Sequence, residues 1–256
     1  MDTLNVTLVQ SHLYWENPKA NLASFSEKLA KIPSTTDLVI LPEMFTTGFT
    51  MTPERMAISE GSKSFDWMKQ WAMEKKIAIT GSVVFNEMGK NYNRLFFVYP
   101  NGSSDFYDKK HTFTLAGEDQ VYEAGTKKII VDYKGFKICP LICYDLRFPV
   151  WARNIEDYDV LLYVANWPKP RIHAWDTLLR ARAIENMSYC IGVNRVGLDA
   201  LGHEYIGHSA VYDVLGEQLV FSEKEEMLHA TLSKEHITSN RNKLKFLDDR
   251  DSFNLL

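Results

Sequence analysis

The segment KICPLICYDLRFP, Lys137–Pro149, places a cysteine at the end of an apolar run and follows it at once with polar and charged residues. The residues up to Cys143 have the pattern of a buried strand, and Tyr144, Asp145 and Arg147 come directly after it. Cys143 is therefore either a small core residue at a strand end or a nucleophile at the rim of a sheet. Because cysteine is among the most buried residue types, the segment alone favours the core residue.

Strands and helices alternate on both sides of this segment. The run DLVILPEMF, 37–45, has the continuous apolar character of a strand covered on both faces and ends as a strand at Pro42. Residues 171–186 form the clearest helix, with Ile172, Trp175, Leu179 and Ala183 on one face. The remaining strands are expected at 4–10, 77–85, 94–100, 135–143, 159–165, 189–195 and 226–233, further helices at 18–32 and 65–75, and a hairpin at 209–222.

This alternation predicts one layered α/β domain over residues 1–256, with both faces of its sheet covered. The length of 256 residues is sufficient for one large domain of this class with a substantial core. No repeat, low-complexity tract or linker interrupts the pattern.

Charge and hydropathy exclude several classes of partner. A net charge of -4 without a cluster of Lys and Arg argues against nucleic acid and against an anionic membrane surface. No apolar run approaches the roughly 18 residues that span a bilayer. The first residues, MDTLNVTLVQ, lack a signal-peptide pattern, so we expect a cytoplasmic protein.

The cysteines do not predict a disulfide framework or a metal site. Cys139, Cys143 and Cys190 are too few and too irregularly spaced for disulfides. The spacing Cys139-x-x-x-Cys143 is neither a zinc knuckle nor a C-x-x-C redox pair. We therefore expect no metal and no organic cofactor.

Three further polar residues are predicted to lie at the end of a strand or in a loop next to a strand. Glu43 follows the apolar run VILP, Lys109 lies in FYDKKHTF, and Glu118 lies in AGEDQVYEAG. Each has an ordinary alternative, because a loop carboxylate or a lysine is usually solvated. His111 suggests a Cys–His dyad, but its neighbours match no papain-like or caspase-like signature. Their occurrence together with Cys143 is more informative than any one of them, since open α/β folds bind ligands at strand ends.

The segments LPEMFTTGF, YDKKHTF and ICYDLRFP resemble the three signature segments of the nitrilase superfamily of carbon–nitrogen hydrolases. In that family they carry a glutamate, a lysine and a cysteine, which correspond to Glu43, Lys109 and Cys143. The family pattern Lys-x-His selects Lys109 and leaves Lys110 as the spacer, and a second family glutamate corresponds to Glu118. The resemblance implies a four-layer α-β-β-α sandwich and a homodimer whose sheets stack into a larger sandwich.

Within the superfamily, YVANWP and RARAIENMSYCIGVNRVG resemble the ω-amidase branch, which hydrolyses the distal amide of 2-oxoglutaramate and 2-oxosuccinamate. The alternatives are another amidase, a carbamoylase or a nitrilase of the same superfamily, which apply the same chemistry to a different small substrate. Two other classes of protein fit the sequence less well than these hydrolases. A non-catalytic binding module has no need of the three signature residues, and a peroxidatic role for Cys143 needs a resolving cysteine or a thioredoxin-like context, neither of which is apparent.

The resemblance gives each of these residues an expected role. A free thiol titrates near 8.5, so Cys143 needs a base, and Glu43 accepts the thiol proton and later passes it to the departing ammonia. The Lys109 ammonium and the Tyr144 backbone N–H stabilise the negative charge on the carbonyl oxygen. Glu118 holds Lys109 in place, and a water activated by Glu43 hydrolyses the resulting thioester.

Three residues are candidates for binding the rest of a small amide substrate. Arg147 lies four residues after the nucleophile and can hold a carboxylate through two parallel hydrogen bonds, or else it pairs with Glu156 or Asp157. Asn166 and Trp167 end another strand on the same side, where they form a pocket wall, or Trp167 covers the edge of the core.

Overall fold

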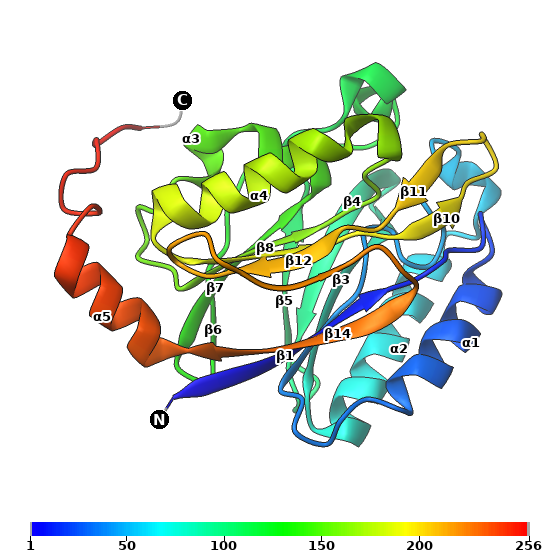
Figure 1. The fold of residues 1–256 in the computed structure, drawn as a ribbon. Coiled ribbons are helices and arrows are strands. Elements are labelled where there is room, and N and C mark those ends of the chain that lie inside the picture. Colours follow the sequence, from blue (N-terminus) through cyan, green and yellow to red (C-terminus); the bar gives the residue numbers. More distant parts are fainter. Residues whose placement is uncertain (1, 255–256) are drawn as a thin grey trace.

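In the computed structural model, which describes residues 2–254, two six-stranded sheets pack face to face between layers of helices (Figure 1). Helices α1 and α2 cover the first sheet, and α4 covers the second. The largest apolar cluster lies between the sheets and combines residues such as Leu8 and Ile40 of the first with Leu141 and Ile191 of the second. The predicted four-layer α-β-β-α sandwich is confirmed.

The strands and helices have the following bounds. The first sheet runs in the order β14 (Glu226–Ser233), β1 (Thr3–Gln10), β2 (Leu38–Ile40), β3 (Ala78–Glu87), β4 (Lys90–Val98) and β5 (Ser104–Asp108). The second runs in the order β13 (Gln218–Ser222), β12 (Ser209–Tyr212), β9 (Tyr189–Val193), β8 (Val160–Val164), β7 (Phe136–Ile142) and β6 (Val131–Tyr133). A small ribbon pairs β10 (Val196–Leu198) with β11 (Glu204–Ile206). The helices are α1 (Pro18–Leu29), α2 (Glu60–Lys75), α3 (Pro149–Ala152), α4 (Ile172–Asn186) and α5 (Lys234–Leu244), with short 3₁₀ turns η1 (Pro53–Arg55), η2 (Thr114–Ala116), η3 (Glu118–Gln120), η4 (Cys143–Arg147) and η5 (Lys169–Arg171).

Each sheet has three parallel strands at its centre, and these strands determine where polar side chains gather. β1, β2 and β3 run parallel in the first sheet, and β7, β8 and β9 run parallel in the second. Glu43 follows β2, Cys143 follows β7 and Asn166 follows β8. Because the carboxyl ends of parallel strands lie at one edge, each sheet brings its polar residues to the same edge of the sandwich.

All the predicted strands and helices are present, and their bounds differ in two informative places. The strand predicted over 37–42 ends at Ile40. The Leu41 N–H still donates to the Thr80 carbonyl, but Pro42 has no N–H with which to continue the hydrogen bonds to β3. The second helix begins at Glu60 rather than Phe65. Its Gly61 lies against β3, where a Cβ would be only 2.5 Å from the Val84 carbonyl oxygen.

Several elements gave no clear signal in the sequence. Helix α5 buries only Ile237, so it lacks the apolar stripe that marks a helix, and β5 is the largely exposed and charged segment SDFYD. β6, β10 and β11 have three residues each, too few to show a period. In α2, the apolar residues Met68 and Ala72 are buried, whereas Trp67 and Trp71 are only partly buried.

None of the helices in the described part of the chain combines the length and the apolar character needed to cross a bilayer.

Helix α4 packs closely on β9 because residue 192 has no side chain. A Cβ on Gly192 would lie 2.4 Å from Leu179 Cδ1 and 2.6 Å from Trp175 Cζ2. We predict that Gly192→Ala lowers the free energy of unfolding by about 1–3 kcal/mol, the usual cost of overpacking a core. Urea denaturation followed by circular dichroism measures this, and an unchanged midpoint would show that α4 can move away from β9 without cost.

Candidate active site

Glu43 is fully buried in a turn that the neighbouring strand β3 holds in place. The Met44 N–H donates to Ser82 Oγ at 2.9 Å, and the Phe45 N–H donates to the Ser82 carbonyl at 3.1 Å. Both hydrogen bonds fix the backbone directly after Glu43. The carboxylate is therefore anchored at its base rather than free to turn toward solvent, which excludes the alternative of a solvated loop acid.

The Glu43 carboxylate accepts hydrogen bonds from three sides. Its Oε1 accepts from Lys109 Nζ at 2.9 Å and from Asn93 Nδ2 at 2.8 Å, and its Oε2 accepts from the Asn166 backbone N–H at 2.8 Å. These hydrogen bonds engage both carboxylate oxygens and fix the orientation of the Glu43 side chain.

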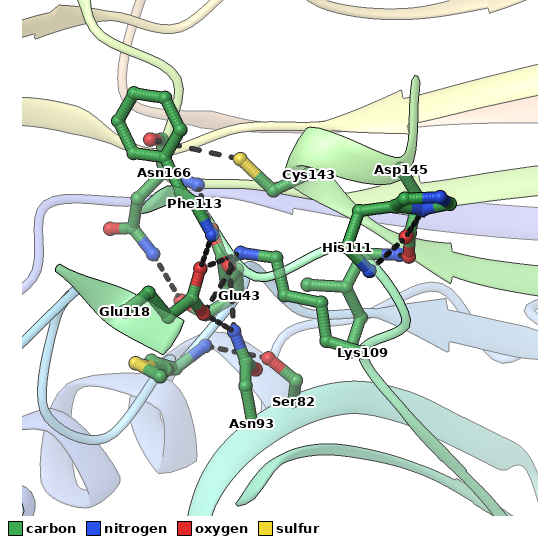
Figure 2. A network of polar contacts seen from close by, with 12 residues as sticks. Glu43, Ser82, Asn93, Lys109, His111, Phe113, Glu118, Cys143, Asp145 and Asn166 are labelled. Carbon is green, nitrogen blue, oxygen red and sulfur yellow. Dashed lines mark hydrogen bonds and ion pairs between the residues drawn. The ribbon is translucent and has the colours of Figure 1, made fainter. Parts of the chain in front are cut away.

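Lys109 follows β5 and lies between two carboxylates (Figure 2). Its Nζ donates to Glu43 and, at 2.8 and 3.0 Å, to both carboxylate oxygens of Glu118. Burial favours the neutral amine, but the negative charges of Glu118 and Glu43 outweigh it and raise the pKa of Lys109 above its usual range. Lys109 is therefore an ammonium at neutral pH, and the alternative of a solvated surface lysine is wrong.

Glu118 begins the turn η3 and is also fully buried. Besides Lys109, it accepts from the Phe113 N–H at 2.5 Å and from Asn93 Nδ2 at 3.2 Å. Burial raises the pKa of Glu118, and the Lys109 ammonium opposes that rise. Asn93 thus links the two glutamates, a role that the sequence did not indicate because Asn93 lies within β4 and outside the signature segments.

Cys143 is the first residue of η4, and its backbone has a φ of +44°. Residues other than glycine seldom adopt this conformation, and strained positions of this kind cluster at functional sites. The thiol sulfur lies 4.0 Å from the Asn166 carbonyl oxygen (Figure 2). Burial, reinforced by the charge of Glu43, raises the pKa of Cys143 well above its usual range. The thiol is therefore protonated at neutral pH, and a nucleophilic role would require a base beside it.

Asp145 connects the turn that carries Cys143 to the segment that carries Lys109. Its Oδ2 accepts from the Ile142 N–H at 3.0 Å and the Tyr107 hydroxyl at 2.8 Å. Its Oδ1 accepts from the His111 N–H at 3.0 Å and lies 2.8 Å from His111 Nδ1. His111 therefore pairs with Asp145, which accounts for the spacing Lys-x-His without a Cys–His dyad.

A pocket of about 300 Å³ opens beside Cys143. The candidates Tyr144, Arg147, Asn166 and Trp167 all line it. Further lining residues that the sequence analysis did not select include Phe49, Phe113, Arg171, Asp199 and Tyr205. These residues come from loops and from the β10–β11 ribbon, so only the folded chain brings them together.

The structure distinguishes the alternatives for the substrate-binding candidates. Glu156 pairs with Lys128 at 2.8 Å and Asp157 pairs with Arg250 at 2.8 Å, so neither is the partner of Arg147. Trp167 lines the pocket and also packs 5.5 Å from the ring of Trp175, so it is both a pocket wall and an edge of the core. Within residues 2–254, no group of three or more His, Cys, Asp or Glu side chains is placed to hold a metal ion.

The carbon–nitrogen hydrolase family matches residues 5–242. The chain belongs to the carbon–nitrogen hydrolase family. It is 45% identical to the omega-amidase YafV of Yersinia enterocolitica, with 100% of each chain covered. It is 30% identical to the 2-oxoglutaramate amidase of Bacillus subtilis, with 95% of this chain and 96% of the relative covered.

Among solved structures, this carbon–nitrogen hydrolase resembles XC1258 from Xanthomonas campestris, described as a CN-hydrolase superfamily protein with an arsenic adduct in the active site. The TM-score is 0.96 at 40% identity, with 100% of each chain covered. The family and these relatives make the chain a hydrolase of carbon–nitrogen bonds in linear amides.

The hydrogen bonds of Asp145 generate a prediction for this hydrolase. Asp145→Asn keeps the size of the side chain but replaces one accepting oxygen with an NH₂ group, which leaves a buried donor such as the Tyr107 hydroxyl without an acceptor. We predict a loss of about 1–3 kcal/mol in the free energy of unfolding. Because Cys143 and Lys109 then lose their common anchor, kcat should fall by about tenfold or more with a smaller change in KM.

Asp105→Asn provides the matched control, because Asp105 also accepts from a tyrosine hydroxyl, that of Tyr99 at 2.7 Å, but at an exposed site. This variant should keep wild-type kcat and a wild-type unfolding midpoint. Full activity in a folded Asp145→Asn enzyme would contradict the positioning role of Asp145.

Proposed function

We propose that this carbon–nitrogen hydrolase is an ω-amidase that releases ammonia from the distal amide of small dicarboxylic monoamides, such as 2-oxoglutaramate and 2-oxosuccinamate. Full-length similarity to relatives named omega-amidase and 2-oxoglutaramate amidase supports the reaction. The structural observation that carries the proposal is the arrangement of Glu43, Lys109 and Cys143 beside a small pocket that also contains Arg147. A guanidinium in that pocket suits a substrate with a carboxylate at its far end.

The first half of the reaction forms a thioester on Cys143. As the sulfur attacks the amide carbon, Glu43 takes the thiol proton, and negative charge develops on the carbonyl oxygen. The Lys109 ammonium and the Tyr144 N–H stabilise that charge, each donor contributing about 2.7–4 kcal/mol to the transition state. Glu43 then returns the proton to the amide nitrogen, the carbon–nitrogen bond breaks, and ammonia leaves.

The second half releases the acid. A water molecule gives a proton to Glu43 and attacks the thioester carbon, again with the charge on oxygen stabilised by Lys109. The carbon–sulfur bond breaks, the thiolate recovers a proton from Glu43, and the product leaves as a dicarboxylate. Glu118 contributes by holding the Lys109 ammonium in place and charged throughout.

The proposal predicts a covalent intermediate that depends on one sulfur. Brief exposure of the wild-type enzyme to 2-oxoglutaramate, followed by acid quenching and mass spectrometry, should locate an acyl group on Cys143. Cys143→Ser should remain folded but show no turnover, because an alcohol has a far higher pKa than a thiol and Glu43 is too weak a base to ionise it.

Two results would contradict this proposal in different ways. Retained activity in a folded Cys143→Ser variant would mean that the nucleophile lies elsewhere. Hydrolysis of nitriles or N-carbamoyl compounds in preference to 2-oxoglutaramate would contradict the ω-amidase assignment while leaving the thioester mechanism in place.

We also infer a homodimer, as the family resemblance implies. Supporting this inference, Ile184 of α4 and Phe221 of β13 line a shallow hollow on the outer face of the second sheet and are 46% and 36% exposed. Covering such side chains removes apolar surface from water. Sedimentation at micromolar concentration should give the mass of two chains, and a monomer would refute the inference. The cytoplasmic location stays a prediction from the sequence.

A further inference from the structure

Two arginines line the pocket without a carboxylate partner. Arg147 ends η4, just after the nucleophile, and Arg171 ends η5, just before α4. Within residues 2–254, neither guanidinium makes an ion pair or a hydrogen bond with another side chain. Most other arginines close to carboxylates in this chain are paired, as Arg94 is with Asp108 at 2.7 Å.

Each of the two guanidiniums lies over an aromatic ring of the pocket wall. The central carbon of Arg147 is 4.9 Å from the centre of the Trp167 ring, and that of Arg171 is 5.1 Å from the centre of the Phe113 ring. Contact of this kind engages the flat face of a guanidinium and leaves its N–H groups free to donate in its plane. A guanidinium held in this way is prepared to bind an anion through two hydrogen bonds.

The two aromatic rings are themselves fixed to the catalytic cluster. Trp167 Nε1–H donates to the Arg171 carbonyl at 2.8 Å, so the ring that carries one guanidinium also holds the backbone of the other. The Phe113 N–H donates to Glu118, which in turn binds Lys109. Trp167 also follows Asn166, whose N–H donates to Glu43 at 2.8 Å, so hydrogen bonds of the protein fix the rings under both arginines and little ordering is needed when a ligand binds.

The pocket has one further carboxylate, and its oxygens are already engaged. Asp199 accepts from the Leu201 and His203 backbone N–H groups, contacts His203 Nδ1 at 3.0 Å, and accepts from the Tyr205 hydroxyl at 3.0 Å. Its side chain is only 3% exposed. The charge of the two arginines is thus left for a ligand to neutralise.

We propose that Arg171 is a second specificity-determining residue, which binds the substrate carboxylate jointly with Arg147. This inference rests on the proposed ω-amidase function and identifies the residues that select its substrates. The amide end of the substrate reaches Cys143, and the far carboxylate lies between the two guanidiniums. Amides without that carboxylate lose both contacts and are poor substrates.

The test compares Arg147→Met, Arg171→Met and the double variant on two amides of similar length, 2-oxoglutaramate and uncharged pentanamide. Losing a charge-assisted hydrogen bond should lower kcat/KM on 2-oxoglutaramate about ten- to a hundredfold in each single variant, mainly through KM. The loss on pentanamide should be much smaller. Because both arginines hold one carboxylate, their effects in the double variant should not be additive.

Lys69→Met is the matched control, since the Lys69 ammonium lies 5.4 Å from the Phe65 ring in α2, also a cation over an aromatic ring but away from the pocket and from the hollow between α4 and β13. It should behave like the wild type on both substrates. An Arg171→Met enzyme that matches this control, or that loses activity equally on both amides, would overturn the role of Arg171.

Glutarate, a dicarboxylate that cannot be hydrolysed, separates this inference from the proposed function. Glutarate should inhibit turnover competitively in the wild type, and Arg171→Met should raise its inhibition constant by at least about tenfold. One combination of results would keep the anion site and contradict the ω-amidase function. In it, the wild type hydrolyses pentanamide but not 2-oxoglutaramate, and Arg171→Met still raises the inhibition constant of glutarate. Unchanged glutarate inhibition in Arg171→Met would refute the anion site whatever the preferred amide.

Discussion

The active site depends on one buried ammonium held between two buried carboxylates. Lys109, Glu43 and Glu118 are each no more than 1% exposed, and burying such charges without partners is strongly unfavourable. The three residues belong to separate segments, after β2, after β5 and in η3. Their ion pairs therefore fix three loops at once, and Asn93 completes the arrangement by donating to both carboxylates. Removing the Lys109 ammonium would leave two buried carboxylates without a counter-ion, so the cluster depends on that residue.

The sandwich brings the nucleophile to this cluster. Glu43 and Lys109 come from the first sheet, whereas Cys143 and Asn166 follow strands of the second. The hydrogen bond from the Asn166 N–H to Glu43 joins the two sheets at the point where, in the proposed mechanism, sulfur and carboxylate exchange a proton. A raised pKa for Cys143 fits this arrangement, because proton transfer then accompanies attack on the substrate and the resting enzyme keeps a neutral thiol.

The sequence predicts those parts of the molecule that have periodically spaced apolar residues or a signature motif. Helix α4 shows its apolar face clearly, and all four residues assigned to that face are buried, whereas α5 has a single buried apolar residue and no visible period. The signature segments indicate Glu43, Lys109 and Cys143 directly. The sequence does not identify Asn93, Asp145 or Arg171, because their contacts depend on which loops the two sheets bring together. Strand register and loop contacts of this kind belong to the tertiary structure, and a local sequence pattern does not predict them.

The distribution of charge along the pocket orients a substrate. Of the catalytic cluster, Lys109 and Cys143 line the pocket, and the Lys109 ammonium there is already paired with Glu43 and Glu118. The guanidiniums of Arg147 and Arg171 lie beside the same pocket, and no carboxylate among residues 2–254 pairs with them. In the proposed function, a monoamide that also bears a carboxylate is therefore best stabilised with its amide at Cys143 and its carboxylate against the two arginines, whose charge is not already paired within the pocket.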